Sequence, residues 1–197
     1  PDGGVDVFFT EDDTGRFSQL RLGFEDGTMT SEEVRSFTIG TITEGCTVDD
    51  RTGTVYMAEE NVGVWTFSAD PSAGDDRVMF AEIDNEALVA DAEGVTLWPS
   101  EAYGDRLVVS SQGDSAYAVF DLETAELIGR FEIAGGEIDR TTETDGIDIH
   151  AGALPGYPEG LFLAQDDAED TGGQNFKIVD LTDVRLALEG WSASDED

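Results

Sequence analysis

A short acidic motif recurs in this sequence at a spacing of about fifty residues. An acid followed by glycine stands at Glu44, at Glu93 and at Asp145, so that successive acids are separated by 49 and then 52 residues. Units of this length that contain several short strands are typical of β-propeller blades. The repeat constrains the fold more than any single motif, because one unit can bury its apolar face only against its neighbours.

Short apolar runs separated by Gly- and Asp-rich turns fill most of the chain, which is the pattern of short β-strands. We expect strands over residues 5–10, 17–22, 34–39, 54–58, 62–68, 78–82, 95–98, 106–111, 116–121, 126–133, 147–151, 161–165 and 175–180. Only residues 181–188 suggest a helix. The sequence therefore predicts an all-β chain.

The charge of the chain restricts its partners. Asp and Glu number 45 against 10 Lys and Arg, which gives a formal net charge of −35. Binding to nucleic acid is excluded because it requires a basic face, and no apolar run is long enough to predict a membrane span. Like charges at this density oppose a compact state, so high salt, bound cations or both must offset the repulsion. Halophilic adaptation and Ca²⁺ binding by the carboxylates are compatible explanations.

The repeat also places the acids. Equivalent positions of successive blades meet around the axis of a propeller, so Glu44, Glu93 and Asp145 are expected near one mouth of the central channel. Carboxylates held that close must take up protons or be neutralised by cations. Oxygen ligands without a Cys and His set favour Ca²⁺ over Zn²⁺. The alternative is that each acid–glycine pair is a turn whose carboxylate lies in solvent.

Other conspicuous residues have simpler interpretations. Cys46, the single cysteine, is expected to be a small buried hydrophobe, since no basic partner stands near it in the sequence. The only histidine, His150, is expected to be structural, and Trp65 and Trp98 to lie in the core. The acidic run at residues 166–170 is either a solvated loop or a calcium-binding loop.

Several ordered stretches carry a family resemblance. They are residues 34–37, 43–45, 49–60 (DDRTGTVYMAEE), 63–65, 91–94, 110–117 (SSQGDSAY), 144–148 (TDGID), 160–166 (GLFLAQD) and 174–177 (QNFK). In this order they resemble the β-propeller phytases, calcium-dependent enzymes that release phosphate from phytate (inositol hexakisphosphate). The resemblance covers about residues 34–180.

The resemblance implies a six-bladed β-propeller. Residues 1–190 would form a partial phytase domain, the C-terminal portion of about four blades or fewer, and residues 191–197 a polar tail. A missing N-terminal half or a tandem phytase domain would then complete the ring. Secretion is expected from the resemblance alone.

The resemblance also implies a site. Its calcium ligands, several ions in all, would be Glu44, Glu60, Asp91, Glu93, Asp139, Asp145 and Asp166. The surroundings of Asp139, and the residues that follow Asp166, depart from the family pattern. Glu60, Glu93 and Gln112 would be catalytic, and Gln112 would also bind substrate. Related enzymes commonly have a lysine in the region of Arg16, so Arg16 is a candidate substitute in phosphate binding.

A 3-phytase-type mechanism follows from these expectations. Calcium held by the acids would attract the phosphoryl groups of phytate or another inositol phosphate, and a calcium-bound water would attack phosphorus directly. Glu60 would orient or deprotonate that water. The alternative is an incomplete, non-catalytic calcium-binding propeller domain that assists a complete phytase domain, because most basic phosphate-binding residues of the family have no counterpart here. A scaffold propeller without calcium is a third hypothesis.

Overall fold

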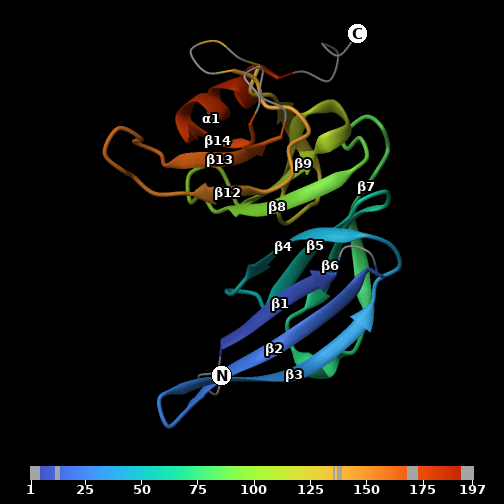
Figure 1. The fold of residues 1–197 in the computed structure, drawn as a ribbon. Helices are drawn as coiled ribbons and strands as arrows, with labels where there is room; N and C mark the ends of the chain where they lie inside the picture. The colour runs from blue at the N-terminus through green and yellow to red at the C-terminus, as the bar shows by residue number, and fades with distance from the viewer. Residues whose placement is uncertain (1–4, 12–13, 135, 137–138, 168–172, 192–197) are drawn as a thin grey trace.

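The described part of the chain is all-β, with four antiparallel sheets and one α-helix (Figure 1). The structure is a computed structural model that describes residues 5–11, 14–134, 136, 139–167 and 173–191. The first sheet contains β1 (Val5–Glu11), β2 (Arg16–Glu25) and β3 (Thr28–Thr38). The second contains β4 (Thr43–Asp49), β5 (Thr54–Glu59), β6 (Gly63–Ser68) and β7 (Arg77–Glu82).

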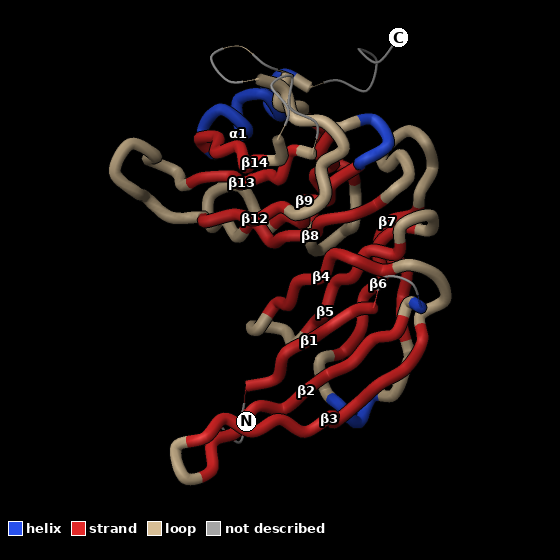
Figure 2. The backbone as a smooth tube through the Cα atoms, viewed as in Figure 1, coloured by secondary structure: helices blue, strands red, loops and turns tan. Residues whose placement is uncertain are grey.

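The third sheet contains β8 (Ala92–Trp98), β9 (Arg106–Ser111), β10 (Ala116–Asp121) and β11 (Leu127–Phe131). The fourth contains β12 (Ile147–His150), β13 (Leu161–Asp166) and β14 (Asn175–Asp180), and helix α1 (Leu181–Gly190) follows it. Short 3₁₀ turns, η2 (Pro71–Ala73) and η3 (Gln112–Asp114), lie between strands. Strands dominate the backbone trace (Figure 2).

The prediction of an all-β chain is confirmed, and β9, β10 and β14 have the predicted bounds. The ranges predicted for strands omitted β4. Its side chains alternate poorly between apolar and polar, and the β4–β5 register shifts between Thr43 and Cys46, so the period-two pattern is broken there.

Apolar side chains fill the space between consecutive sheets. Phe17, Met57 and Phe67 belong to a core shared by the first and second sheets. A second core joins the β4–β7 and β8–β11 sheets, and a third joins the β8–β11 sheet to the fourth sheet and α1. This face-to-face succession of antiparallel sheets is compatible with part of a β-propeller.

Strands β4, β8 and β12 are the first strands of their sheets, and they lie side by side: β4 contacts β8, and β8 contacts β12. The acid–glycine pairs lie at or just before the starts of these strands. A Cβ on Gly45 would overlap the carbonyl oxygen of Glu93, and one on Gly94 would overlap that of Asp145. The backbone N–H of Gly94 also donates to the Asp145 carbonyl oxygen over 3.0 Å. Glycine is therefore required where one sheet's motif packs against the next.

Helix α1 begins where the Asp180 carboxylate accepts a hydrogen bond from the backbone N–H of Thr182 over 2.8 Å, an N-cap. Leu181, Val184 and Leu188 are buried in the third core. This spacing places them on one face of the helix. No helix among the described residues is long and apolar enough to cross a membrane.

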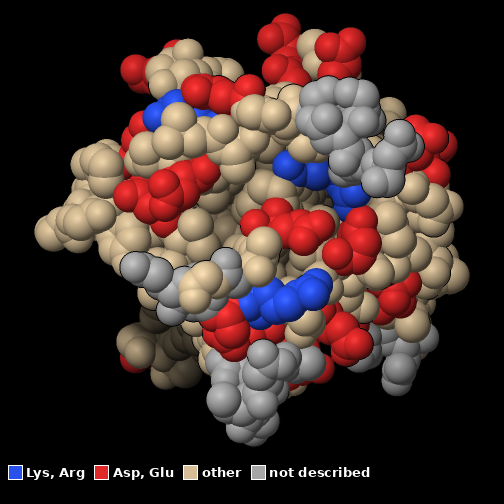
Figure 3. Space-filling view, turned by 90° about the horizontal axis from the view of Figure 1, so that it is seen from above, with Lys and Arg blue, Asp and Glu red and all other residues tan. Residues whose placement is uncertain are grey.

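Among the charged side chains on the face seen from above, acidic ones prevail over basic ones (Figure 3). Basic side chains on this view are few and lie next to acidic ones. The strong negative charge is therefore a property of the folded surface as well as of the composition.

Candidate metal centre

Three carboxylates from two sheets converge at the starts of the inner strands. Glu44 lies near the start of β4, Glu60 directly follows β5, and Glu93 lies near the start of β8. Each offers a carboxylate oxygen, and these oxygens all lie within 4.8 Å of one another. Glu44 and Glu93 both project from β-bulges, where the β4–β5 and β8–β9 registers shift. A bulge re-aims a side chain out of the regular alternation, which explains how both acids face the same space.

Glu93 is the most perturbed member of the cluster. Its side chain is 3% exposed, and its Oε2 has no hydrogen-bond partner within the described part of the chain. Burial, followed by a hydrogen bond with Glu44 and the negative charges of Glu44, Glu60 and Asp145, raises the pKa of Glu93 to about 9. At neutral pH the cluster therefore holds a proton unless a cation replaces it.

Asp145 approaches the cluster from the fourth sheet. Its Oδ1 accepts a hydrogen bond from Nε2 of Gln112 over 2.6 Å, and its backbone N–H donates to Oε1 of Gln165 over 3.0 Å. The backbone N–H of Gln165 donates in turn to the carbonyl oxygen of Gly146 over 2.9 Å. Gln112 and Gln165 thus hold the Asp145 loop from two neighbouring sheets.

The donor set fits a hard divalent cation. The groups whose charges perturb Glu93 most strongly, Glu44, Glu60 and Asp145, are all carboxylates. The oxygen of Glu93 that lacks a partner is an available ligand atom. Carboxylate oxygens without sulfur or imidazole suit Ca²⁺ or Mg²⁺ better than Zn²⁺. Glu44, Glu60 and Glu93 are the residues that could hold such an ion, with Asp145 beside them.

Asp91 and Arg16 are among the predicted site residues that lie outside this three-carboxylate cluster. Asp91 is in the loop before β8, where its carbonyl oxygen accepts a hydrogen bond from the backbone N–H of Gln112 over 2.9 Å. Arg16, at the start of β2, forms an exposed ion pair with Glu33 over 2.8 Å. The cluster does not include Arg16, and its candidacy in phosphate binding stays a prediction.

Asp139 and Asp166 are brought together around the single lysine of the chain. Nζ of Lys177 lies 2.6 Å from Oδ1 of Asp139 and 3.1 Å from Oδ2 of Asp166. Asp166 is fully buried, and Lys177 is 5% exposed. An ammonium group therefore stands between the two acids that the resemblance assigns to calcium. Of the acidic run at residues 166–170, positions 168–170 lie outside the described residues.

The remaining sequence interpretations concern the core. Cys46 is partly buried against the first core, and burial raises the pKa of its thiol, in agreement with a small hydrophobe. Trp98 lies in the third core and Trp65 packs against the first, as predicted. His150 is exposed at the end of β12.

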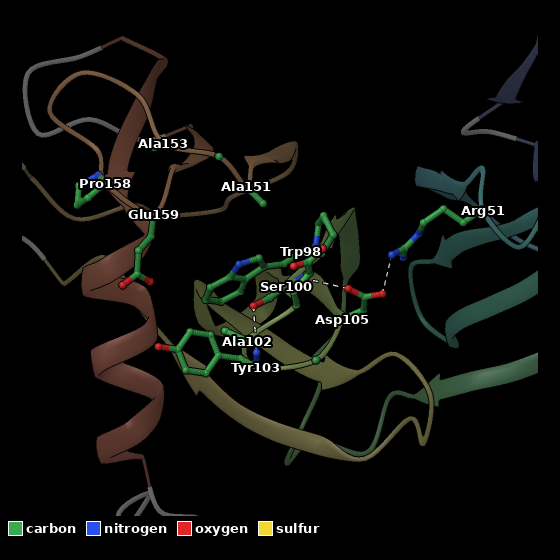
Figure 4. Close-up of a pocket in the computed structure, with 14 residues that line it drawn as sticks. Arg51, Trp98, Ser100, Ala102, Tyr103, Asp105, Ala151, Ala153, Pro158 and Glu159 are labelled. Atoms are coloured by element: carbon green, nitrogen blue, oxygen red, sulfur yellow. Dashed lines mark hydrogen bonds and ion pairs between the residues drawn. The ribbon is translucent and has the colours of Figure 1, made fainter.

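A pocket of about 940 Å³ lies at the opposite ends of the inner strands (Figure 4). It is lined by Trp98 at the end of β8, by the loop between β8 and β9, which includes Tyr103, and by residues of the β12–β13 loop. Arg51 and Asp105 form an ion pair at its edge over 2.7 Å. Two of its charged groups are thus paired with each other, whereas the carboxylate cluster at the other end brings like charges together.

Comparison with known proteins identifies the family. The sequence profile of the family described as Phytase matches residues 8–197. The chain belongs to the phytase family. It is 39% identical over 160 residues to the 3-phytase of Bacillus subtilis (strain 168), an alignment that covers 78% of this chain. The chain spans 42% of the length of that phytase relative. The resemblance stated from the sequence is therefore confirmed at the level of the family.

Sequence reasoning missed three polar side chains around the acids. Gln165 holds the backbone of Asp145, Lys177 faces Asp139 and Asp166, and Glu59 lies buried next to Glu60. Gln165 and Lys177 stand in stretches that carry the resemblance, but their roles depend on contacts between distant segments. Glu59 could have been noticed as an acid next to Glu60 in an apolar strand, because a buried carboxylate needs hydrogen-bond partners.

Proposed function

We propose that this chain is part of a calcium-dependent phytase that hydrolyses phosphomonoesters of phytate or related inositol phosphates. The carboxylate cluster of Glu44, Glu60 and Glu93 is the observation that carries the proposal, together with membership of the family. In this proposal the sheets are blades of a propeller, the acids surround one mouth of its channel, and the protein acts outside the cell, where calcium is abundant.

The electrostatics of the site support a cation-dependent reaction. A protein of net charge −35 repels a polyphosphate unless cations stand between them. When bound, a divalent cation would neutralise phosphoryl charge and lower the pKa of nearby water. The chain's own groups would then divide the remaining tasks.

Glu60 is the most suitable base for activating water. It is only partly buried, whereas Glu93 is nearly inaccessible and protonated in the cation-free chain. Gln112 would orient Asp145 through its 2.6 Å hydrogen bond and donate its other amide hydrogen to a phosphoryl oxygen. Direct attack by water on phosphorus needs no nucleophilic side chain.

Phosphate release from phytate tests the proposal. Phosphate should appear with Ca²⁺ and stop with a chelator. Glu60→Gln should lower the rate by about 10²-fold or more, because it removes the base and leaves the shape of the side chain. Glu82→Gln on β7 is a control, because it removes an exposed carboxylate outside the cluster and leaves the cluster intact. Equal rates with Ca²⁺ and chelator would refute the proposal.

A second candidate is a calcium-loaded domain that assists a complete phytase domain without catalysing the reaction itself. The groups that perturb Glu93 most strongly are all carboxylates, which favours this alternative, since phosphate binding commonly uses lysine and arginine side chains. It predicts calcium binding to the chain without phosphate release. Phosphate release by this chain alone would exclude it.

A further inference from the structure

A buried polar side chain ends the second strand in each of three sheets. Glu59 is the last residue of β5, Ser111 of β9 and Asp166 of β13, and their exposed fractions are 4%, 0% and 0%. Glu59 pairs with Thr43 and Ser111 with Ala92, the residues that directly precede Glu44 and Glu93. We call Glu59, Ser111 and Asp166 the clamp residues.

Each clamp residue accepts a hydrogen bond from the loop that leads to an acid of the repeat. The Thr41 N–H donates to Oε1 of Glu59, the Val89 N–H to Oγ of Ser111, and the Thr142 N–H to Oδ1 of Asp166, each over 2.9 Å. These loop residues stand three or four positions before the acids of the repeat. The three side chains differ in chemistry, but each accepts a hydrogen bond from a backbone N–H of the loop.

A backbone hydrogen bond accompanies each clamp. The backbone N–H of the residue that follows each clamp residue donates to a carbonyl oxygen of the same loop. These bonds run from Glu60 to Ile42 over 3.1 Å, from Gln112 to Asp91 over 2.9 Å, and from Asp167 to Thr142 over 3.2 Å. Glu60 and Gln112 are themselves residues of the candidate site. The clamp therefore fixes the acid on one strand relative to the functional side chain that follows the next strand.

Glu59 makes the most complete clamp. Oε1 also accepts a hydrogen bond from the Thr41 hydroxyl over 2.7 Å, and Oε2 accepts one from Nε1 of Trp65 over 2.7 Å. A Cβ on Gly40 would lie 2.8 Å from Oε1, so the loop backbone lies directly against the carboxylate. Three donors to a buried carboxylate hold it in one orientation.

We propose that Glu59, Ser111 and Asp166 are positioning residues, equivalent across three sheets, that hold the acid-bearing loops in the geometry needed for cation binding. The inference rests on the proposed cation binding by Glu44, Glu60 and Glu93. The clamp residues act through the loop backbone. Outer partners that orient ligands commonly change metal affinity by about 10–100-fold when they are removed.

Calcium affinity of clamp variants tests this role, measured by calorimetric titration at a temperature where every variant is folded. Glu59→Ala removes all three acceptor contacts and should weaken affinity about tenfold. Glu59→Gln retains a carbonyl oxygen for Thr41 and should recover most of that loss. The matched control is Arg35→Met, which removes hydrogen bonds from a buried guanidinium to the carbonyl oxygens of Ser68, Asp70 and Gly74, away from the acid loops. It should lower the melting temperature and leave calcium affinity unchanged.

Amide hydrogen exchange in the metal-free chain separates this inference from the proposed function. Glu59→Ala should speed exchange in residues 41–46, and Ser111→Ala, a smaller change that keeps the core filled, should do so in residues 89–94. If the wild-type chain binds no calcium, the proposed function fails, and exchange alone decides whether the clamps hold the loops. Unchanged exchange in both folded variants, or unchanged calcium affinity in folded Glu59→Ala and Ser111→Ala, would overturn the inference.

Discussion

The amide of Gln112 donates a hydrogen bond to the carboxylate of Asp145 over 2.6 Å, and so joins the end of β9 to the loop before β12. Through this contact a neutral group from one sheet holds an acid of the next sheet near Glu93. It separates two roles within one cluster. Glutamate side chains supply the charge, and the glutamine orients a carboxylate without adding to the repulsion.

Substitution of Gln112 should therefore distinguish these roles. Gln112→Glu places a negative charge against Asp145 and should lower the free energy of unfolding in chelator by about 2 kcal/mol, whereas Gln112→Ala should cost about 1 kcal/mol. Saturating Ca²⁺ should narrow the difference between the two variants, because a cation offsets the added charge. Urea unfolding with and without Ca²⁺ measures both values, and a difference that persists in Ca²⁺ would contradict the assignment.

The raised pKa of Glu93 predicts a pH-dependent stability of the cation-free chain. The folded chain keeps a proton that the unfolded chain releases, between the ordinary pKa of 4.5 and the raised value of about 9. Stability is therefore greatest below this window and falls as pH rises through it. Glu93→Gln mimics the protonated group, so near pH 8 the free energy of unfolding of this variant should be roughly 2 kcal/mol higher than that of wild type.

Urea unfolding in chelator at about pH 5 and about pH 8 checks this expectation. The exposed Glu101→Gln is the matched control, because it removes the same charge outside the cluster. Equal pH dependence in Glu93→Gln and wild type would show that Glu93 ionises normally.

Because the acid–glycine motifs of neighbouring sheets pack closely, we expect Gly94 and Gly146 to tolerate substitution by alanine unequally. Gly94→Ala should destabilise the chain by about 3 kcal/mol, because the new Cβ meets backbone atoms of Asp145 and Ile147 that cannot move freely. Gly146 occupies the same repeat position, but nothing described lies within 4 Å of its added Cβ. Gly146→Ala should cost less than about 1 kcal/mol. Similar losses of melting temperature in the two variants would argue against the packing.

Lys177 is buried between the buried Asp166 and the half-exposed Asp139, which predicts a large effect of removing the lysine's charge. Lys177→Met leaves Asp139 and the fully buried Asp166 without their ammonium partner and should cost about 3 kcal/mol at neutral pH. Arg16→Gln breaks the exposed pair with Glu33 and should cost less than about 1 kcal/mol. Chemical unfolding of both variants in chelator tests the comparison. If added Ca²⁺ restored Lys177→Met fully, the two acids would be a cation site that the lysine normally fills.

The repeat and the apolar strands could be read from the sequence because both depend on local spacing. Three strands were predicted with the observed bounds, and the acid–glycine motifs indicated which segments meet around the inner strands. Strand β4 was missed because its bulge interrupts the alternation that predicts a strand. The same bulge directs the Glu44 side chain toward the cluster, so the irregularity that prevented prediction of the strand is part of the site.

The finer arrangement of polar groups could not be predicted from spacing. Lys177 is 38 residues from Asp139 in the sequence, and Gln112 is 33 residues from Asp145. Such pairs depend on how whole sheets pack. The clamp residues were equally hidden, because a glutamate, a serine and an aspartate at equivalent positions share no pattern that sequence alone reveals.

Calorimetric titration of the chain with Ca²⁺ near neutral pH, in two buffers of different ionisation enthalpy, tests the central claim most directly. The account predicts binding accompanied by release of up to one proton per chain, since a cation displaces the proton held by Glu93. Both the binding and the proton release should weaken in Glu93→Gln. The account would be contradicted by a folded chain that binds no Ca²⁺, or by binding that releases no proton and is unchanged in Glu93→Gln.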